Sequence, residues 1–139
     1  MLVLEYSDLK SSLARAKEEG DFYHLFYGIL LSSSAKVKQR FIYSDLGALR
    51  TSFQSTFEDI FEYAIGQQQS SSKMDMLRLS HSKNYIGIEP GLYRHWVDSL
   101  LRTLEVLDPE YNPDLEQSWR LALNKVVNYM AAGYEEEGE

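Results

Sequence analysis

The 139-residue sequence contains no cysteine. This absence excludes disulfides, zinc–thiolate sites, iron–sulfur clusters and cysteine nucleophiles. It also lacks a long hydrophobic run. The opening MLVLEYSDLK is apolar for four residues and then carries Glu5, which is unlike a signal peptide. No later run approaches the roughly 20 apolar residues of a membrane span, so we expect a cytoplasmic protein that does not bind a membrane.

Positive charge is scarce. There are 14 lysines and arginines against 21 aspartates and glutamates, which gives a formal net charge of −7. Nucleic-acid phosphates would be repelled unless a strong local basic patch existed, so no nucleic-acid partner is expected. Part of the negative charge lies in the tail, residues 134–139, which we expect to be solvated.

Strand signals are absent as well. We find no convincing period-2 alternation and no Asn-Gly or Asp-Gly hairpin turn. The length and the 44% of apolar residues suit one globular domain over residues 1–139. The sequence therefore predicts an all-α domain of six or seven unequal helices.

Capping residues and glycines divide the chain into these helices. Asp21 is expected to cap the helix DFYHLFYGILL, which is apolar nearly all round and should be buried. Ser44 or Asp45 is expected to cap a longer amphipathic helix that ends near Ile65. The polar stretch QQQSSS indicates a mobile loop over residues 66–73. Later in the chain, Pro90 suits a first helical turn, and Asp114 is expected to cap the last helix.

One histidine stands at the end of a short helical pattern. Leu77 precedes His81 by four residues, so the two side chains share one helix face. A neutral imidazole beside an apolar wall is a good ligand for a metal or for haem iron. The alternative is a structural histidine that only packs.

The order of landmarks resembles a globin, over about residues 7–134. The resemblance is closest to single-domain bacterial haemoglobins and to the globin module of flavohaemoglobins. It rests on an ordered set of segments rather than on any one of them: FYGILLSSSAKVKQRF (26–41), SDLGALRTSF (44–53), LSHSKNYIGIEPGLYRHWVDSLL (79–101) and DPEYNPDLEQSWRLALNKVVNYM (108–130).

The resemblance implies a globin fold around a pocket for haem b, with His81 as the proximal iron ligand. His24 and His95 are rivals in principle, at a helix contact and near the surface respectively. Phe41 matches the aromatic residue that stacks on the haem edge. Tyr27 matches the residue that donates its hydroxyl to bound O₂ in many bacterial globins, although Tyr23 could exchange roles with it if the register is one turn off.

The distal helix departs from the family pattern. Leu49 falls where the family usually has glutamine or histidine, and Phe53 follows one turn later. Both are expected to line the haem, and Phe53 would help Phe41 to fix the ring. A shift of one residue would bring Arg50 closer to the pocket, or Arg50 could pair with a haem propionate.

On the proximal side, the resemblance assigns Ile88 and Tyr93 to the haem lining. Lys83 and Tyr85 are candidate propionate partners. The glutamate that accompanies this tyrosine in flavohaemoglobins has no counterpart, because Asn128 and Met130 occupy that region.

These residues support three functions. The first is a haem globin that reversibly binds O₂, CO and NO for storage, scavenging or sensing. The second is a haem-less globin module for sensing or protein interaction. The third is an NO dioxygenase, which would need an external reductase because the chain ends at Glu139 without a reductase domain or a GxGxxG segment. The enzyme assignment stays open, and the protein is expected to be a monomer or a homodimer.

Overall fold

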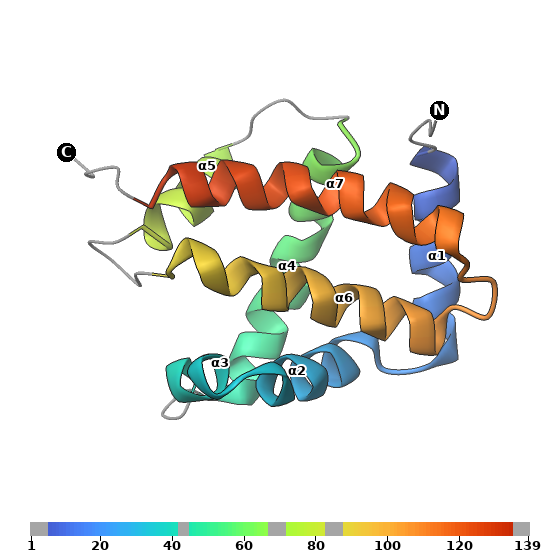
Figure 1. Ribbon diagram of the computed structural model, residues 1–139, viewed down its shortest axis with the longest axis horizontal. Helices are drawn as coiled ribbons and strands as arrows, with labels where there is room; N and C mark the ends of the chain where they lie inside the picture. The colour runs from blue at the N-terminus through green and yellow to red at the C-terminus, as the bar shows by residue number, and fades with distance from the viewer. Residues whose placement is uncertain (1–5, 42–44, 67–71, 83–87, 135–139) are drawn as a thin grey trace.

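A computed structural model of the chain describes residues 6–41, 45–66, 72–82 and 88–134. These residues form seven α-helices and one 3-10 turn, with no strand among them (Figure 1). The predicted all-α class is confirmed. The elements in chain order are α1 (Tyr6–Glu19), α2 (Phe22–Ser33), α3 (Ala35–Arg40), α4 (Leu46–Ala64), α5 (Ser72–Ser80), the 3-10 turn η1 (Pro90–Leu92), α6 (Tyr93–Leu107) and α7 (Pro113–Ala132).

Side-chain caps fix where several helices begin. Asp21 accepts a hydrogen bond from the His24 backbone N–H, and Asp45 accepts one from Ala48, as predicted. The predicted cap of α7 is wrong. Asn112, not Asp114, accepts from the Leu115 N–H at 2.9 Å. Pro113 takes the first helical position because its missing N–H costs nothing there, and this moves the cap one residue upstream.

The predicted loop over residues 66–73 falls largely outside the described residues. The structure begins α5 at Ser72, so the last two residues of that range belong to a helix. The predicted tail lies outside the described part from residue 135 onward.

The helices pack in crossed layers. Figure 1 shows α6 and α7 antiparallel and side by side, with α4 crossing behind them and α2 and α3 along one edge. Helix α6 contacts α1, α2 and α7, while α5 contacts α4 and α7. Aromatic side chains fill the centre: Phe22, Phe26, Phe57 and Trp119 are each at most 2% exposed. Throughout the described ranges, every helix is too short or too polar to cross a bilayer.

A buried carboxylate links the first helix to the junction between the last two helices. The Asp108 side chain is 0% exposed and accepts hydrogen bonds from Arg15 Nε at 2.6 Å and Ser12 Oγ at 2.7 Å. Ser12 in turn accepts from the Trp119 indole N–H at 3.0 Å. Burial opposes ionisation of Asp108, but these hydrogen bonds and one from the Glu110 N–H outweigh it, so the pKa of Asp108 lies below 3.8. The network ties α1 to the α6–α7 junction.

We predict that Asp108→Asn lowers the free energy of unfolding by about 3 kcal/mol, because the half-buried Arg15 guanidinium loses its charged partner. Chemical denaturation measures this. Asp98→Asn is the matched control, since Asp98 pairs with Arg120 in an exposed bridge; its effect should stay within about 0.5 kcal/mol. Equal losses in the two variants would contradict the claim that the buried network stabilises the fold more than the exposed bridge does.

We also predict a pH dependence. Because the pKa of Asp108 is depressed in the folded protein, the stability that its carboxylate contributes should be lost as the pH falls below 3.8.

Candidate functional site

A largely apolar cavity of about 580 Å³ lies between the α2–α3–α4 side of the molecule and the α5–α6–α7 side. Its volume falls within the roughly 300–1,000 Å³ of typical small-molecule and cofactor sites. Predicted site residues from both halves of the chain line it: Tyr27, Phe41, Phe53, His81, Ile88 and Tyr93. The structure thus brings together six residues that are up to 66 positions apart in the sequence.

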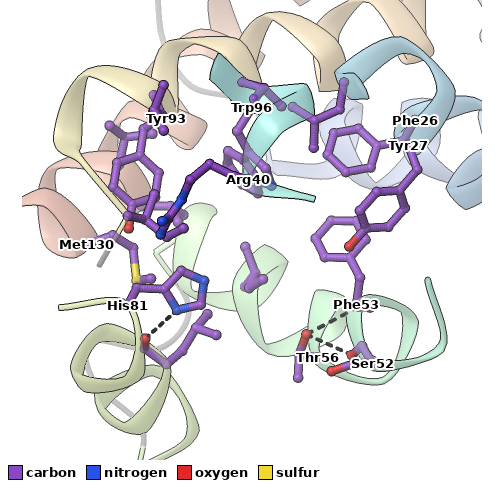
Figure 2. Close-up of a pocket in the computed structure, with 18 of the residues that line it drawn as sticks. Phe26, Tyr27, Arg40, Ser52, Phe53, Thr56, His81, Tyr93, Trp96 and Met130 are labelled. Carbon is purple, nitrogen blue, oxygen red and sulfur yellow. Dashed lines mark hydrogen bonds between the residues drawn. The ribbon is translucent and has the colours of Figure 1, made fainter. Parts of the chain in front are cut away.

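His81 follows directly after α5, and its ring is fixed by the last turn of that helix. Its Nδ1 lies 2.8 Å from the Leu77 carbonyl oxygen, which can only accept, so Nδ1 carries the proton. In the neutral ring the Nε2 lone pair is then free. Figure 2 shows this second nitrogen pointing toward the middle of the cavity. The Ile88 N–H donates to the His81 carbonyl at 3.0 Å and joins the two lining residues.

The cavity wall keeps this imidazole neutral. Burial disfavours the charged ring and lowers the pKa of His81 below 6.5, and the hydrogen bond to Leu77 only partly opposes the shift. Neither His24 nor His95 is among the described residues that line the cavity. Of the three histidines, His81 is therefore the one placed to act as a ligand there.

The opposite wall is a stack of aromatic rings from α2 and α4. Phe53 stacks on Phe26 with ring centroids 5.1 Å apart and meets Tyr27 edge-on at 5.9 Å. Phe41 meets Tyr27 edge-on at 6.4 Å. Tyr27 is 9% exposed, and burial raises its pKa to about 12, so its hydroxyl keeps its proton at neutral pH. This wall presents a protonated phenol beside rigid rings (Figure 2).

Tyr93, at the start of α6, carries a second buried phenol. Tyr93 is 8% exposed, and its hydroxyl oxygen has no hydrogen-bond partner among the residues that the structure describes. Burial raises the pKa of Tyr93 to about 12. An unsatisfied buried hydroxyl costs free energy, so a polar atom of a bound molecule or an ordered water is its expected partner. Met130 of α7 lines the cavity beside it.

Arg40 is a lining residue that the sequence analysis missed. It stands at the end of α3, directly before Phe41, and is the one acidic or basic side chain among the described lining residues apart from His81. Figure 2 shows it extending along the cavity toward the α6 side. Its position directly before Phe41, a predicted haem contact, was the feature of the sequence that could have indicated this role. The predicted Lys83 and Tyr85, and the side chains of Leu49 and Arg50, lie outside what the structure describes.

The lining has no set of several protein ligands for a bare ion. Among the described residues, no group of three or more histidine, cysteine, aspartate or glutamate side chains could hold a metal. One imidazole in an apolar cavity instead suits a metal that arrives with its own equatorial ligands, as iron does in a porphyrin. The donor set therefore fits a haem.

We predict that the His81 imidazole titrates with a midpoint below 6.5 in the protein without added ligand. The unfolded chain binds this proton more readily, so His81 should reduce stability as the pH falls below 6.5. The ring-proton chemical shift of His81, followed by NMR against pH, measures the midpoint. A midpoint at or above 6.5 would contradict the buried, carbonyl-bonded geometry.

Comparisons with known proteins bear on the fold. No protein-family model matches the sequence, and no curated protein matches it. Among solved structures, the chain is similar to the crystal structure of protein PA3967 from Pseudomonas aeruginosa PAO1, which is described as structurally highly homologous to a human haemoglobin. The TM-score is 0.85 at 25% sequence identity, over 94% of this chain and 98% of that one. Together with the seven described helices, this match shows that the chain has a globin-like fold, as its sequence landmarks predict.

Proposed function

We propose that this chain, acting as a single globin domain, binds haem b in the cavity and uses the iron to bind O₂, CO or NO reversibly. The observation that carries the proposal is the His81 geometry. Nδ1 is held by the Leu77 carbonyl at 2.8 Å, and Nε2 faces an apolar cavity of about 580 Å³. A hydrogen bond to the rear nitrogen of a ligating histidine fixes its tautomer and orientation. His81 would thus be the proximal ligand of the iron.

The rest of the lining suits the other parts of a haem. The rings of Phe41 and Phe53, with Ile88, would contact the flat apolar macrocycle. Haem also carries two propionate carboxylates, and Arg40 is the cation among the described lining residues. A guanidinium can bind a carboxylate through two parallel hydrogen bonds. Arg40 therefore joins, or replaces, Lys83 and Tyr85 as the proposed propionate partner.

Tyr27 would act on the bound gas. Its phenol is protonated at neutral pH and lies across the cavity from His81 (Figure 2). The iron supplies the gas-binding chemistry, and bound O₂ acquires partial negative charge. A buried hydroxyl donor stabilises such charge more strongly than one exposed to water. The Thr56 hydroxyl of the same wall is bonded to the Ser52 carbonyl, so Tyr27 would be the main polar contact of the gas.

The other two functions have less support. In a haem-less module, bulky side chains would be expected to fill the pocket, whereas here Phe53 and Phe26 stack against one wall and leave the cavity open. An NO dioxygenase would require a reductase as an electron source. No observation on the described residues points to a docking site for one, so we propose gas binding rather than this reaction.

Absorption spectra of the purified protein with added haem test the proposal. We expect a sharp Soret band that shifts with CO after reduction and saturates at one haem per chain. His81→Ala should abolish stoichiometric uptake and leave the helical content intact, because it removes the axial ligand. His95→Ala is the matched control and should bind haem as the parent does. Full haem retention by His81→Ala, or no saturable uptake by the parent, would overturn the proposal.

We predict that Tyr27→Phe speeds O₂ dissociation several-fold, as expected from the loss of a hydrogen bond worth about 1–2 kcal/mol. Stopped-flow mixing of the oxygenated protein with CO measures the rate. Tyr23→Phe is the control for register, since Tyr23 is also buried on α2 but does not line the cavity in the described structure. A faster rate in Tyr23→Phe, with none in Tyr27→Phe, would exchange the two roles.

A further inference from the structure

The helix that carries His81 is held on one side by a cluster of side chains from α4, α5 and α7. We propose that this cluster, centred on Arg78 and Tyr129, positions α5 and so aims the His81 ring into the cavity. The inference rests on the proposed haem function for its consequence, but its structural part can be tested without haem. It concerns residues that do not line the cavity.

The Arg78 side chain contacts Tyr129 of α7. Its guanidinium carbon is 4.5 Å from the centroid of the Tyr129 ring, within the range of a cation–π contact. The Tyr129 hydroxyl donates a hydrogen bond to Asp75, one turn earlier on α5. Tyr129 of α7 thus contacts two positions of α5. These two contacts oppose rotation of α5 about its own axis and sliding of α5 along that axis.

The cluster continues into α4 and the end of α7. Tyr63 packs on Tyr129 with ring centroids 5.1 Å apart, and Lys125 lies 4.6 Å from the centroid of Tyr63. Gly133 leaves room for the Arg78 side chain, because a Cβ at this position would come within 3.0 Å of three Arg78 atoms. The arginine also brings positive charge to the carboxyl end of α7, where the helix dipole favours it.

The periodicity of α5 connects this cluster to the ligand. Met74, Arg78 and His81 lie on one face of the helix, because residues three and four apart are neighbours. On the opposite face Met76 is 70% exposed and Leu79 is 38% exposed, so these two side chains hold that side of the helix less firmly than buried ones would. The apolar attachment of α5 is Met74, which is 1% exposed, together with the half-buried Leu77. The Arg78–Tyr129 contact opposes rotation of α5 about this small apolar attachment.

Leu77 transmits the helix position to the ring. Its carbonyl holds His81 Nδ1, so any rotation or fraying of the last turn of α5 moves the acceptor and the imidazole together. Arg78 is therefore a positioning residue for His81 and not a ligand. Replacing Arg78 should first increase local unfolding of α5.

Two variants test this. Arg78→Gln removes the cation, while Gly133→Ala keeps every group of the cluster and displaces Arg78 by crowding its stem. Gly133 has a φ of −84°, so alanine adds no backbone strain there. The matched controls are Arg120→Gln, in an exposed pair with Asp98, and Gly28→Ala, where an added Cβ meets nothing within 4 Å.

The first measurement is amide hydrogen exchange of the protein without haem. We expect protection of the α5 amides, and of the His81 N–H bonded to Leu77, to fall by about five- to tenfold in both variants, with α6 unchanged. The controls should exchange like the parent. Unchanged protection in α5, or an equal loss along the whole chain, would overturn the positioning role.

The second measurement uses the haem-loaded protein. Haem loss to an excess of a haem-scavenging protein should be about fivefold faster in both variants, and the iron–histidine stretching band of the ferrous form should shift or broaden. A general loss of stability would not move that band. Loosened α5 amides with an unaltered band and haem-loss rate would overturn the link to His81. If the parent takes up no haem, the proposed function fails, while the exchange data still decide whether Arg78 holds α5.

Discussion

The structure depends on holding two groups of helices apart around an apolar cavity. The apolar side chains that line a cavity of about 580 Å³ lack packing partners on one side, so this region contributes less to stability than a filled core would. A ligand that fills it stabilises the fold by mass action. Binding is therefore expected to add stability to a chain that is already folded, and contacts outside the cavity hold the helices in place without the ligand.

Two polar clusters at opposite ends of the molecule contribute to this. Asp108 ties α1 to the α6–α7 junction through Arg15 and Ser12. Arg78 and Tyr129 tie α5 to the far end of α7. Between them the stacked rings of Phe26 and Phe53 make one stiff wall. The two polar clusters thus support the cavity from positions outside its lining, and one of them positions His81.

Local signals in the sequence predicted the helices well because caps act over three or four residues. Asp21 and Asp45 bond backbone N–H groups three positions on, so their role is visible without any tertiary contact. The error at Asp114 is also local. Proline favours the first position of a helix, so Pro113 places the cap at the preceding residue, Asn112. His81 was identifiable because Leu77 is four residues earlier, which is again a helix-scale relation.

The helical class, the caps at Asp21 and Asp45, and the position of His81 one helical turn after Leu77 follow from the residues alone. The tertiary structure adds that Arg40 reaches the cavity, that the Tyr93 hydroxyl is buried without a partner among the described residues, and that Gly133 makes room for Arg78. The physical reason is the range of the interactions. Helix periodicity and capping depend on neighbours within a turn or two, whereas a cavity wall or a stacked cation depends on the angle at which distant helices cross.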